Sequence, residues 1–394
     1  MNIVVQKFGG TSVSTKGKRQ KIIEKVKKAI DDKKAVIVVV SAMGRQADVY
    51  STDALLSLVS KNCNKVSRDL LISCGEIITA VLLSDELEKE GVSAIPLTGG
   101  QAGIITDKNF GNAKMIEFNK EVIIKLLNEN KTPIVCGFQG MTKDGDFTTL
   151  GRGGSDTTAA ILGSELDAER IEIYTDVDGI MTADPRIVKK ANLIKTISYE
   201  EVFQLADQGA KVIHPKAIIY ASSKNIPIYI KNTLNDCEGT IIKNITSINH
   251  KLITSITSHN DRIQVILKQE ENNLNDNYNK ALQFIAAENI SLDLINICPD
   301  RQVFTISKKD EEKILALFKS LSIKYELLTN CSKIALVGLG MKGIPGVMAK
   351  IYKSLNERNI TVLQTADSHM TIWCLIYEKD LEDAINILHK SFEL

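Results

Sequence analysis

The strongest constraint on the fold is an alternation of two hydrophobic patterns in the first 230 residues. Short apolar runs, typical of strands buried on both faces of a sheet, lie at Ile3–Val5, Val36–Val40, Ile134–Cys136, Ile171–Tyr174 and Ile226–Ile230. The stretches between them show helical spacing, since Ile22, Val26 and Ile30 would share one side of a helix. This alternation predicts an α/β fold, with a mostly parallel sheet flanked by helices and ligands bound at the carboxyl ends of the strands.

From about residue 250 the pattern changes to an internal repeat. The stretches "AAENISLDLI" and "NERNITVLQT" align Asn289 with Asn359, and a second pair of stretches aligns Asp310 with Asp380 at the same offset of 70. Each copy is predicted to be a small α+β module, which buries little surface alone, so we expect the copies or two chains to pair. The expected domains are an α/β domain over 1–245 and two modules over 250–328 and 329–394.

The charge balance argues against nucleic-acid and membrane partners. Lys and Arg total 49 and Asp and Glu total 48, so the net charge is only +1. Apolar runs such as that at 35–40 are far shorter than the ~20 residues of a membrane span. The seven cysteines lack the CxxC spacing of a metal or redox site, and Met1 leads straight into a strand-like run rather than a signal peptide. We therefore expect a cytoplasmic protein.

The stretch "VQKFGGTSV" at 5–13 ends an apolar strand with a lysine, two glycines and two hydroxyl side chains. A Gly-Gly turn lets backbone N–H groups approach a ligand closely, and successive N–H groups bind anions. Lys7 adds a positive charge, and Thr11 and Ser12 add donors at the start of a helix. The pattern predicts a phosphate site, although it is not a Walker loop. The alternative is a tight turn with a surface lysine.

A second glycine loop, "TTLGRGGSDTTAA" at 148–160, repeats this arrangement. Asp156 would repel a phosphate directly, so its place here makes sense if it orients lysine ammonium groups or a metal ion beside the phosphates. Arg152 is suited to clamp a carboxylate through two parallel hydrogen bonds. The alternative is a capped helix after a glycine loop, but two such loops in one α/β domain make that alternative less favoured.

Two further stretches carry acidic groups. The stretch at 174–186, "YTDVDGIMTADPR", follows an apolar strand and contains Asp176, Asp178, Asp184 and Arg186. It partly resembles a calcium loop, but the ligand spacing of an EF-hand fails. In "ISCGE", Ser73, Gly75 and Glu76 are predicted to open a helix, where Glu76 could receive a substrate ammonium group. For Glu76 alone, ordinary capping of the helix N-terminus is the favoured interpretation.

Seven stretches together resemble, in this order, the aspartate kinases of the amino-acid kinase family: "KFGGTSV", "VVVSAMG", "SCGE", "GFQG", "GRGGSDTTA", "TDVDGIMTADPR" and "GAKVIHPKA". The C-terminal repeat resembles the paired regulatory ACT modules of those enzymes, so the resemblance extends nearly end to end. It implies transfer of the γ-phosphoryl group of ATP, with Mg²⁺, to the β-carboxylate of L-aspartate. The product would be 4-phospho-L-aspartate, on the way to lysine, threonine and methionine.

The resemblance also implies a role for each matching residue. Lys7 would be the catalytic lysine on the phosphoryl group, and Asp156 would be the carboxylate that organises it. The substrate aspartate would be held by Arg152 on its α-carboxylate, Glu76 on its α-ammonium, and the pocket residues Ser41 and Ser155. The nucleotide would be held by Gly9, Gly10, Thr11, Thr175, Asp176, Asp184, Arg186 and Lys211. The nucleophile is already an anion, so positioning and charge neutralisation would suffice without a general base.

One stretch departs from the commoner pattern of the family. After "SAMG", many members have a threonine pair that helps to hold the substrate, but this chain has "RQADVYSTDALL" with Ala47 at that place. Whether Thr52 takes over the role is left open. The stretches "SAMGRQAD" and "TADSHMTIW" resemble the diaminopimelate-responsive aspartate kinases of the Bacillus type.

The "GLGMKG" stretch at 338–343 satisfies the GxGxxG dinucleotide pattern, but only about fifty residues follow it, too few for such a domain. In ACT modules a loop of this kind binds an amino-acid effector. The resemblance therefore implies an effector site with Met341, Gly343, Ile344, Pro345, Gly346 and Asn359. We expect feedback inhibition by lysine, threonine or diaminopimelate in a homodimer joined through the modules. The alternative is that both copies serve only to dimerise.

Two other functions stay open from the sequence. One is another amino-acid kinase, acting on glutamate, N-acetylglutamate or carbamate. Glu76 argues against an acylated substrate, because an acylated amine carries no charge for it to pair with. The other is an amino-acid-sensing protein on an inactive kinase scaffold. Lys7, Arg152 and Asp156 argue against that function, because a binding scaffold has no need of all three.

Overall fold

The computed structural model describes residues 1–44, 48–210, 212–245, 251–268, 276–298, 301–321, 323–341 and 344–394. Its contacts divide the chain into two compact units. The first unit comprises Met1–Ile180, Leu193–Ala206 and Lys211–Thr246, and the second comprises Met181–Asn192, Asp207–Ala210 and Ser247–Leu394. The second unit thus includes two short segments from within 1–245. The domain boundaries expected at 245, 250 and 328 stay a prediction.

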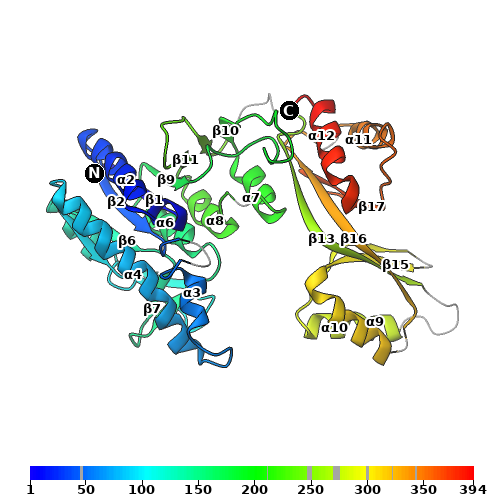
Figure 1. Cartoon of the computed structure of the whole chain (residues 1–394), viewed down its shortest axis with the longest axis horizontal. Coiled ribbons are helices and arrows are strands. Elements are labelled where there is room, and N and C mark those ends of the chain that lie inside the picture. Colours follow the sequence, from blue (N-terminus) through cyan, green and yellow to red (C-terminus); the bar gives the residue numbers. More distant parts are fainter. Residues whose placement is uncertain are drawn as a thin grey trace. The chain divides into compact units, whose positions relative to one another are not determined.

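The first unit contains a mostly parallel sheet, as predicted (Figure 1). Among the described residues its eight strands lie in the order β10 (Thr196–Ile197), β12 (Thr240–Ile242), β11 (Ile228–Asn232), β9 (Arg170–Thr175), β1 (Ile3–Phe8), β2 (Ala35–Val40), β6 (Thr132–Cys136) and β3 (Ala94–Leu97). Neighbouring strands are parallel except for β11 and β12. The predicted apolar runs correspond to β1, β2, β6, β9 and β11. The carboxyl ends of β9, β1, β2 and β6 therefore lie side by side.

Helices cover both faces of this sheet. They are α1 (Gly10–Val13), α2 (Lys16–Asp31), α3 (Thr52–Ser57), α4 (Lys65–Lys89), α5 (Glu121–Asn128), α6 (Gly154–Glu165), α7 (Tyr199–Asp207) and α8 (Pro215–Ser223). On one face, Ile22 of α2 and Leu83 of α4 join Val38 of β2 in a buried cluster. On the other face, Gly163 of α6 lies against Ile171 of β9. The next residue, Glu172, points to the opposite face, where it lines a cavity together with residues of α2. The helical spacing predicted for 22–30 is confirmed in α2.

A smaller sheet leads into the second glycine loop. Its strands lie in the order β5 (Met115–Phe118), β4 (Ile104–Thr106), β7 (Gln139–Thr142) and β8 (Phe147–Thr149). The loop that follows β8 ends where α6 begins at Gly154. The buried Asp69 of α4 accepts hydrogen bonds from the N–H groups of Thr149 and Gly111, both at 2.8 Å. This carboxylate therefore fixes the point from which the glycine loop starts.

The second unit contains an antiparallel sheet with helices on the two copies of the repeat. Its strands lie in the order β14 (Asp293–Ile297), β15 (Arg301–Ser307), β13 (Ser255–Lys268), β16 (Tyr325–Val337), β18 (Thr371–Tyr377) and β17 (Gln364–Asp367), and its helices are α9 (Asp276–Ala287), α10 (Glu311–Ser320), α11 (Val347–Asn356) and α12 (Leu381–Ser391). The offset of 70 residues relates β15 to β18 and the start of α10 to the start of α12. Asn289 and Asn359 both adopt φ 55°.

The two copies of the repeat share their two longest strands, β13 and β16 (Figure 1). The first part of β13, with Ile256, packs in a core with α11 and α12, whereas its second part, with Ile263, packs in a core with α9 and α10. Gln364 donates a hydrogen bond to the carbonyl of Leu294, which is the equivalent position of the other copy. The second copy therefore completes its core and its sheet with the first part of β13, which comes from the start of the first copy.

Among the described residues, none of the helices combines the length and the apolar character that crossing a bilayer requires.

Candidate active site

A cavity of about 390 Å³ in the first unit opens where the parallel strands end. Its walls come from the ends of β1, β2 and β9, the loop after β6, the glycine loop before α6, and one turn of α4. Ten of the residues predicted for the site lie in its wall: Lys7, Gly9, Gly10, Thr11, Ser41, Glu76, Arg152, Ser155, Asp156 and Thr175. The two glycine loops, which are about 140 residues apart in the sequence, therefore face one cavity.

Lys7 and Asp156 form an ion pair inside this cavity. The Lys7 ammonium group, on β1, lies 2.6 Å from a carboxylate oxygen of Asp156, in the first turn of α6. Only 12% and 13% of the two side chains are exposed. Lys7 sits beside Val39 of β2 and Ile173 of β9 in the sheet, so rigid neighbours fix its backbone. The two residues thus share one cavity, as the proposed organisation of Lys7 by Asp156 requires.

Close packing requires a glycine in each of the two loops, at Gly10 and at Gly153. A Cβ atom on Gly10 would lie 2.8 Å from the carbonyl oxygens of both Ala42 and Gly44, which are backbone atoms and cannot give way. Gly153 has φ 69°, and a Cβ there would lie 2.2 Å from the ring of His214. Because the first N–H groups of a helix have no intrahelical acceptor, α1 and α6 both present donors to a ligand.

Glu76 is a buried carboxyl group with half of its hydrogen-bonding capacity unused. It is 2% exposed, and its Oε1 accepts a hydrogen bond of 3.0 Å from the N–H of Ala42. Its Oε2 is buried and has no hydrogen-bond partner among the described residues. Burial, opposed in part by the Ala42 hydrogen bond, raises the pKa of Glu76 to about 8. A cationic ligand group would satisfy Oε2 and restore the charge.

The interpretation of Glu76 as a helix cap is wrong. The segment with Ser73, Gly75 and Glu76 does not open a helix, because α4 begins eleven residues before Glu76, at Lys65. Ser73 donates a hydrogen bond to the carbonyl of Asp69, the residue one turn earlier in α4. Helix capping therefore does not explain an acidic residue at position 76. Its place in the cavity wall does explain it, because a bound cationic group would pair with the carboxylate.

Arg152 is the exposed cation of the cavity wall, and it lies at the tip of the glycine loop. Lys216 of α8 anchors this loop through its ammonium group, which donates to the carbonyl of Leu150 at 2.9 Å. Burial lowers the pKa of Lys216, and burial also lowers the pKa of His214, which caps α8. The hydrogen bond from Lys216 thus fixes the backbone of the glycine loop, while the Arg152 side chain stays accessible to a ligand.

Several cavity residues escaped the sequence reasoning. Phe138 and Gly44 line the wall, as does Thr52, whose role was left open. Phe138 adopts φ 70°, an unusual conformation for a non-glycine residue, in the "GFQG" stretch after β6. That stretch was a usable signal, because it joins a buried strand to a glycine, as the other two loops do. Ala47 lies outside the described residues.

The predicted nucleotide residues do not all lie in one unit. Thr175 is in the cavity wall, and its hydroxyl group donates to the carboxylate of Asp176 at 3.2 Å. Asp184 and Arg186 belong to the second unit, where they form an ion pair of 2.5 Å that lowers the pKa of Asp184. Lys211 lies outside the described residues. The nucleotide roles of these five residues stay predictions.

The predicted effector residues lie in the second unit. Met341 is buried in the core with α11 and α12, whereas Ile344 is 50% exposed. Gly346 caps α11 with φ 89°, and Pro345 precedes it. Asn359 lies three residues after the end of α11, and Gly343 lies outside the described residues. The binding of an effector by these residues stays a prediction.

Comparison with known proteins gives full-length matches. Residues 2–232 match the Amino acid kinase family, and residues 326–390 match the ACT domain. Aspartokinase 1 of Bacillus subtilis is 42% identical over 405 residues, with 100% of both chains covered. The crystal structure of E. coli aspartokinase III in complex with aspartate and ADP has a TM-score of 0.81 at 26% identity over 100% of both chains. The structure of the same enzyme with lysine and aspartate has a TM-score of 0.76 at 25% identity over 99% of both chains.

The parallel sheet, the two glycine loops and the Lys7–Asp156 pair at its edge are thus those of a phosphoryl-transfer enzyme, and the chain belongs to the amino acid kinase family. More narrowly, it belongs to the aspartate kinases with C-terminal ACT modules, which phosphorylate the side-chain carboxylate of aspartate with ATP. The fold class and the enzyme class predicted from the sequence are both confirmed.

Proposed function

We propose that the cavity at the ends of β1, β2 and β9 is where the aspartate β-carboxylate meets the γ-phosphate of ATP. The observation that carries this proposal is the ion pair of Lys7 with Asp156, at the meeting point of the two glycine loops. A carboxylate oxygen attacks the γ-phosphorus, the bond to the bridging oxygen breaks, and ADP leaves with that oxygen's charge. The nucleophile carries no proton, so no base is needed.

The chain's own groups divide into two sets around this reaction. Lys7 and the N–H groups of Gly10 and Thr11 would receive the phosphates, which lowers the repulsion between two anionic substrates. Arg152 would clamp the α-carboxylate of aspartate, and Glu76 would take its α-ammonium group through the unpartnered Oε2. Ser41 and Ser155 would complete the substrate wall. Asp156 would keep the Lys7 ammonium group in place.

We propose Mg²⁺ as the ion that accompanies the nucleotide. Within the described ranges, no group of three or more His, Cys, Asp or Glu side chains is placed to hold a metal ion. Asp156, a carboxylate in the cavity wall beside Lys7, would be a protein oxygen ligand for such an ion. When bound, Mg²⁺ neutralises charge on the phosphates.

The regulatory part of the proposal is feedback inhibition through the second unit, in a homodimer joined by its modules. It is supported by the E. coli relative, whose structure was solved with lysine, and by the repeat in the second unit. Deleting residues 250–394 should abolish inhibition by lysine, threonine or diaminopimelate if active kinase remains; inhibition that survives would contradict this. A cytoplasmic location belongs to the same proposal, and the seven unpaired cysteines support it.

A hydroxamate assay tests the catalytic proposal directly, because it detects the acyl phosphate. L-Aspartate should support turnover, whereas glutamate and N-acetylaspartate should not, since the first is too long for the clamp and the second has no ammonium group for Glu76. Lys7→Met should lower turnover at least about a thousandfold with little change in melting temperature. Near-normal turnover in a folded Lys7→Met variant would overturn the assignment of Lys7.

A further inference from the structure

A single buried hydroxyl group connects the two segments proposed to hold the nucleotide. Thr233 lies in the loop between β11 and β12 and is 1% exposed. Its N–H donates to the carbonyl of Thr175 at 2.9 Å, and its hydroxyl group donates to the same carbonyl at 3.1 Å. That hydroxyl oxygen also lies 2.6 Å from the hydroxyl oxygen of Ser12, which follows the Gly-Gly-Thr turn and is 3% exposed.

The direction of these hydrogen bonds follows from their chemistry. A carbonyl oxygen can only accept, so the single hydroxyl hydrogen of Thr233 is directed to Thr175. When Thr233 donates to Thr175, its oxygen is free to accept, so Ser12 donates to Thr233. The result is a chain of two hydrogen bonds, from the Ser12 hydroxyl through the Thr233 hydroxyl to the Thr175 carbonyl, in which each bond polarises the next. Because α1 starts at Gly10, this chain fixes the distance between the phosphate turn and Thr175.

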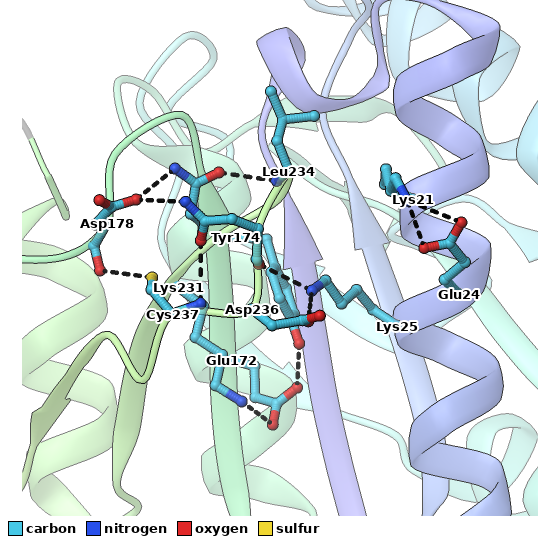
Figure 2. A network of polar contacts seen from close by, with 12 residues as sticks. Lys21, Glu24, Lys25, Glu172, Tyr174, Asp178, Lys231, Leu234, Asp236 and Cys237 are labelled. Carbon is cyan, nitrogen blue, oxygen red and sulfur yellow. Dashed lines mark hydrogen bonds and ion pairs between the residues drawn. The ribbon is translucent and has the colours of Figure 1, made fainter.

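The loop that carries Thr233 is itself fastened on two sides (Figure 2). On one side, the carboxylate of Asp178 accepts hydrogen bonds from the side-chain amides of Asn232 at 2.7 Å and Asn235 at 2.9 Å. On the other side, Lys25 of α2 forms an ion pair of 2.5 Å with Asp236. The loop that carries Thr233 is therefore held in place by contacts both with α2 and with the acidic stretch after β9.

We propose that Thr233 is a positioning residue for the nucleotide, acting by holding the phosphate turn and the Thr175–Asp176 segment at a fixed separation. This inference rests on the proposed nucleotide role of those two segments. Thr233 itself is not in the cavity wall, so it acts through Ser12 and Thr175. Loss of its hydroxyl group should let the two segments drift apart, which weakens nucleotide binding and leaves the aspartate clamp on the glycine loop before α6 intact.

The test compares Thr233→Val, which keeps the shape and removes the hydroxyl group, with Thr233→Ser, which restores the hydroxyl group. Thr233→Val should raise the KM for ATP about fivefold to tenfold, the loss expected for one or two buried hydrogen bonds, with KM for aspartate within about twofold of wild type. Thr233→Ser should return KM for ATP to near the wild-type value. Ser12→Ala, which breaks the same chain from the other end, should raise KM for ATP by a smaller factor, because Thr175 keeps its bond to Thr233.

The chain offers a matched control. Thr106 and Thr148, in β4 and β8, form a second buried hydroxyl pair, also 2.6 Å apart and at most 1% exposed, and neither residue lines the cavity. Thr106→Val should lower the melting temperature about as much as Thr233→Val and leave KM for ATP unchanged. An equal rise of KM for ATP in both variants would mean general loosening and would overturn the inference.

Wild-type KM for ATP in Thr233→Val would also overturn the inference while leaving the proposed function standing. If Thr233→Val does not fold, Ser12→Ala decides in its place, and an unchanged KM for ATP there overturns the inference. Turnover that persists in Lys7→Met would instead overturn the proposed catalytic site, so the two failures are distinguishable.

Discussion

With buried Glu76 as the proposed partner of the substrate ammonium group, aspartate binding should depend on pH. With a pKa of about 8, only about a tenth of the free enzyme at pH 7 carries an ionised Glu76. The proposed pairing with the substrate ammonium group needs the ionised form, so on this proposal binding has to remove the proton. We therefore expect kcat/KM for aspartate to rise about tenfold per pH unit from pH 6 to 7, and then to level off above pH 8.

Proton release is the sharper measurement. At pH 7, aspartate binding in the presence of ADP should release about 0.9 proton per site, and the number should fall towards zero above pH 9. Titration calorimetry in two buffers of different ionisation enthalpy measures this number directly. Glu76→Gln, a neutral side chain of the same shape, should show weak aspartate binding, no proton release and a flat pH profile. A wild-type kcat/KM that is constant from pH 6 to 8, without proton release, would refute the reasoning.

The same group should affect stability, and the sign follows from the raised pKa. The folded state keeps the proton of Glu76 up to about pH 8, whereas the unfolded chain loses it near pH 4.5. Its contribution to stability is therefore fully present below pH 4.5 and is lost as the pH rises to 8, by at most about 5 kcal/mol. Glu76→Gln should become progressively more stable than the wild type over this interval, as measured by urea unfolding.

Two further predictions follow from the glycine loops. Arg152→Lys keeps the charge but loses the two parallel hydrogen bonds, so KM for aspartate should rise about tenfold while KM for ATP stays near the wild-type value; equal rises in both would count against the clamp. Gly10→Ala places a methyl group 2.8 Å from the carbonyls of Ala42 and Gly44 and should abolish ATP binding. Gly17→Ala in α2 is the control, because a Cβ atom at Gly17 would meet no other group within 4 Å; it should raise the unfolding free energy by up to about 1 kcal/mol. Melting curves and ATP titrations check both, and a Gly10→Ala variant with normal ATP binding would contradict the packing argument.

The parts of the site that could be predicted from the sequence are those fixed by strand ends. Lys7 is the second-last residue of β1 and Thr175 the last residue of β9, and these two strands are parallel neighbours. A fold class predicted from the apolar runs therefore already places them near each other. Asp156 followed for a similar reason, because its glycine loop resembles the first. Glu76 was harder, because only the length of α4 shows that it lies far from a helix terminus.

The parts that the sequence could not predict depend on contacts between distant segments. Thr233 stands in an ordinary polar loop, and its importance arises only because Ser12 lies 2.6 Å away in space. Asp184 and Arg186 follow the strand end at Thr175 by about ten residues, yet they belong to the second unit, because Ala183 and Val188 are buried in its core. Secondary-structure propensity and the spacing of apolar residues do not indicate in which of two cores a segment is buried.

The strands shared in the second unit limit how this region can be divided. The second copy relies on the first part of β13, which belongs to the first copy, so a break in the chain between the copies leaves β16 with an open sheet edge. A fragment that carries only one copy should aggregate or remain unfolded until its counterpart is supplied. A chimaeric enzyme with altered feedback should therefore fold only when both copies are exchanged together.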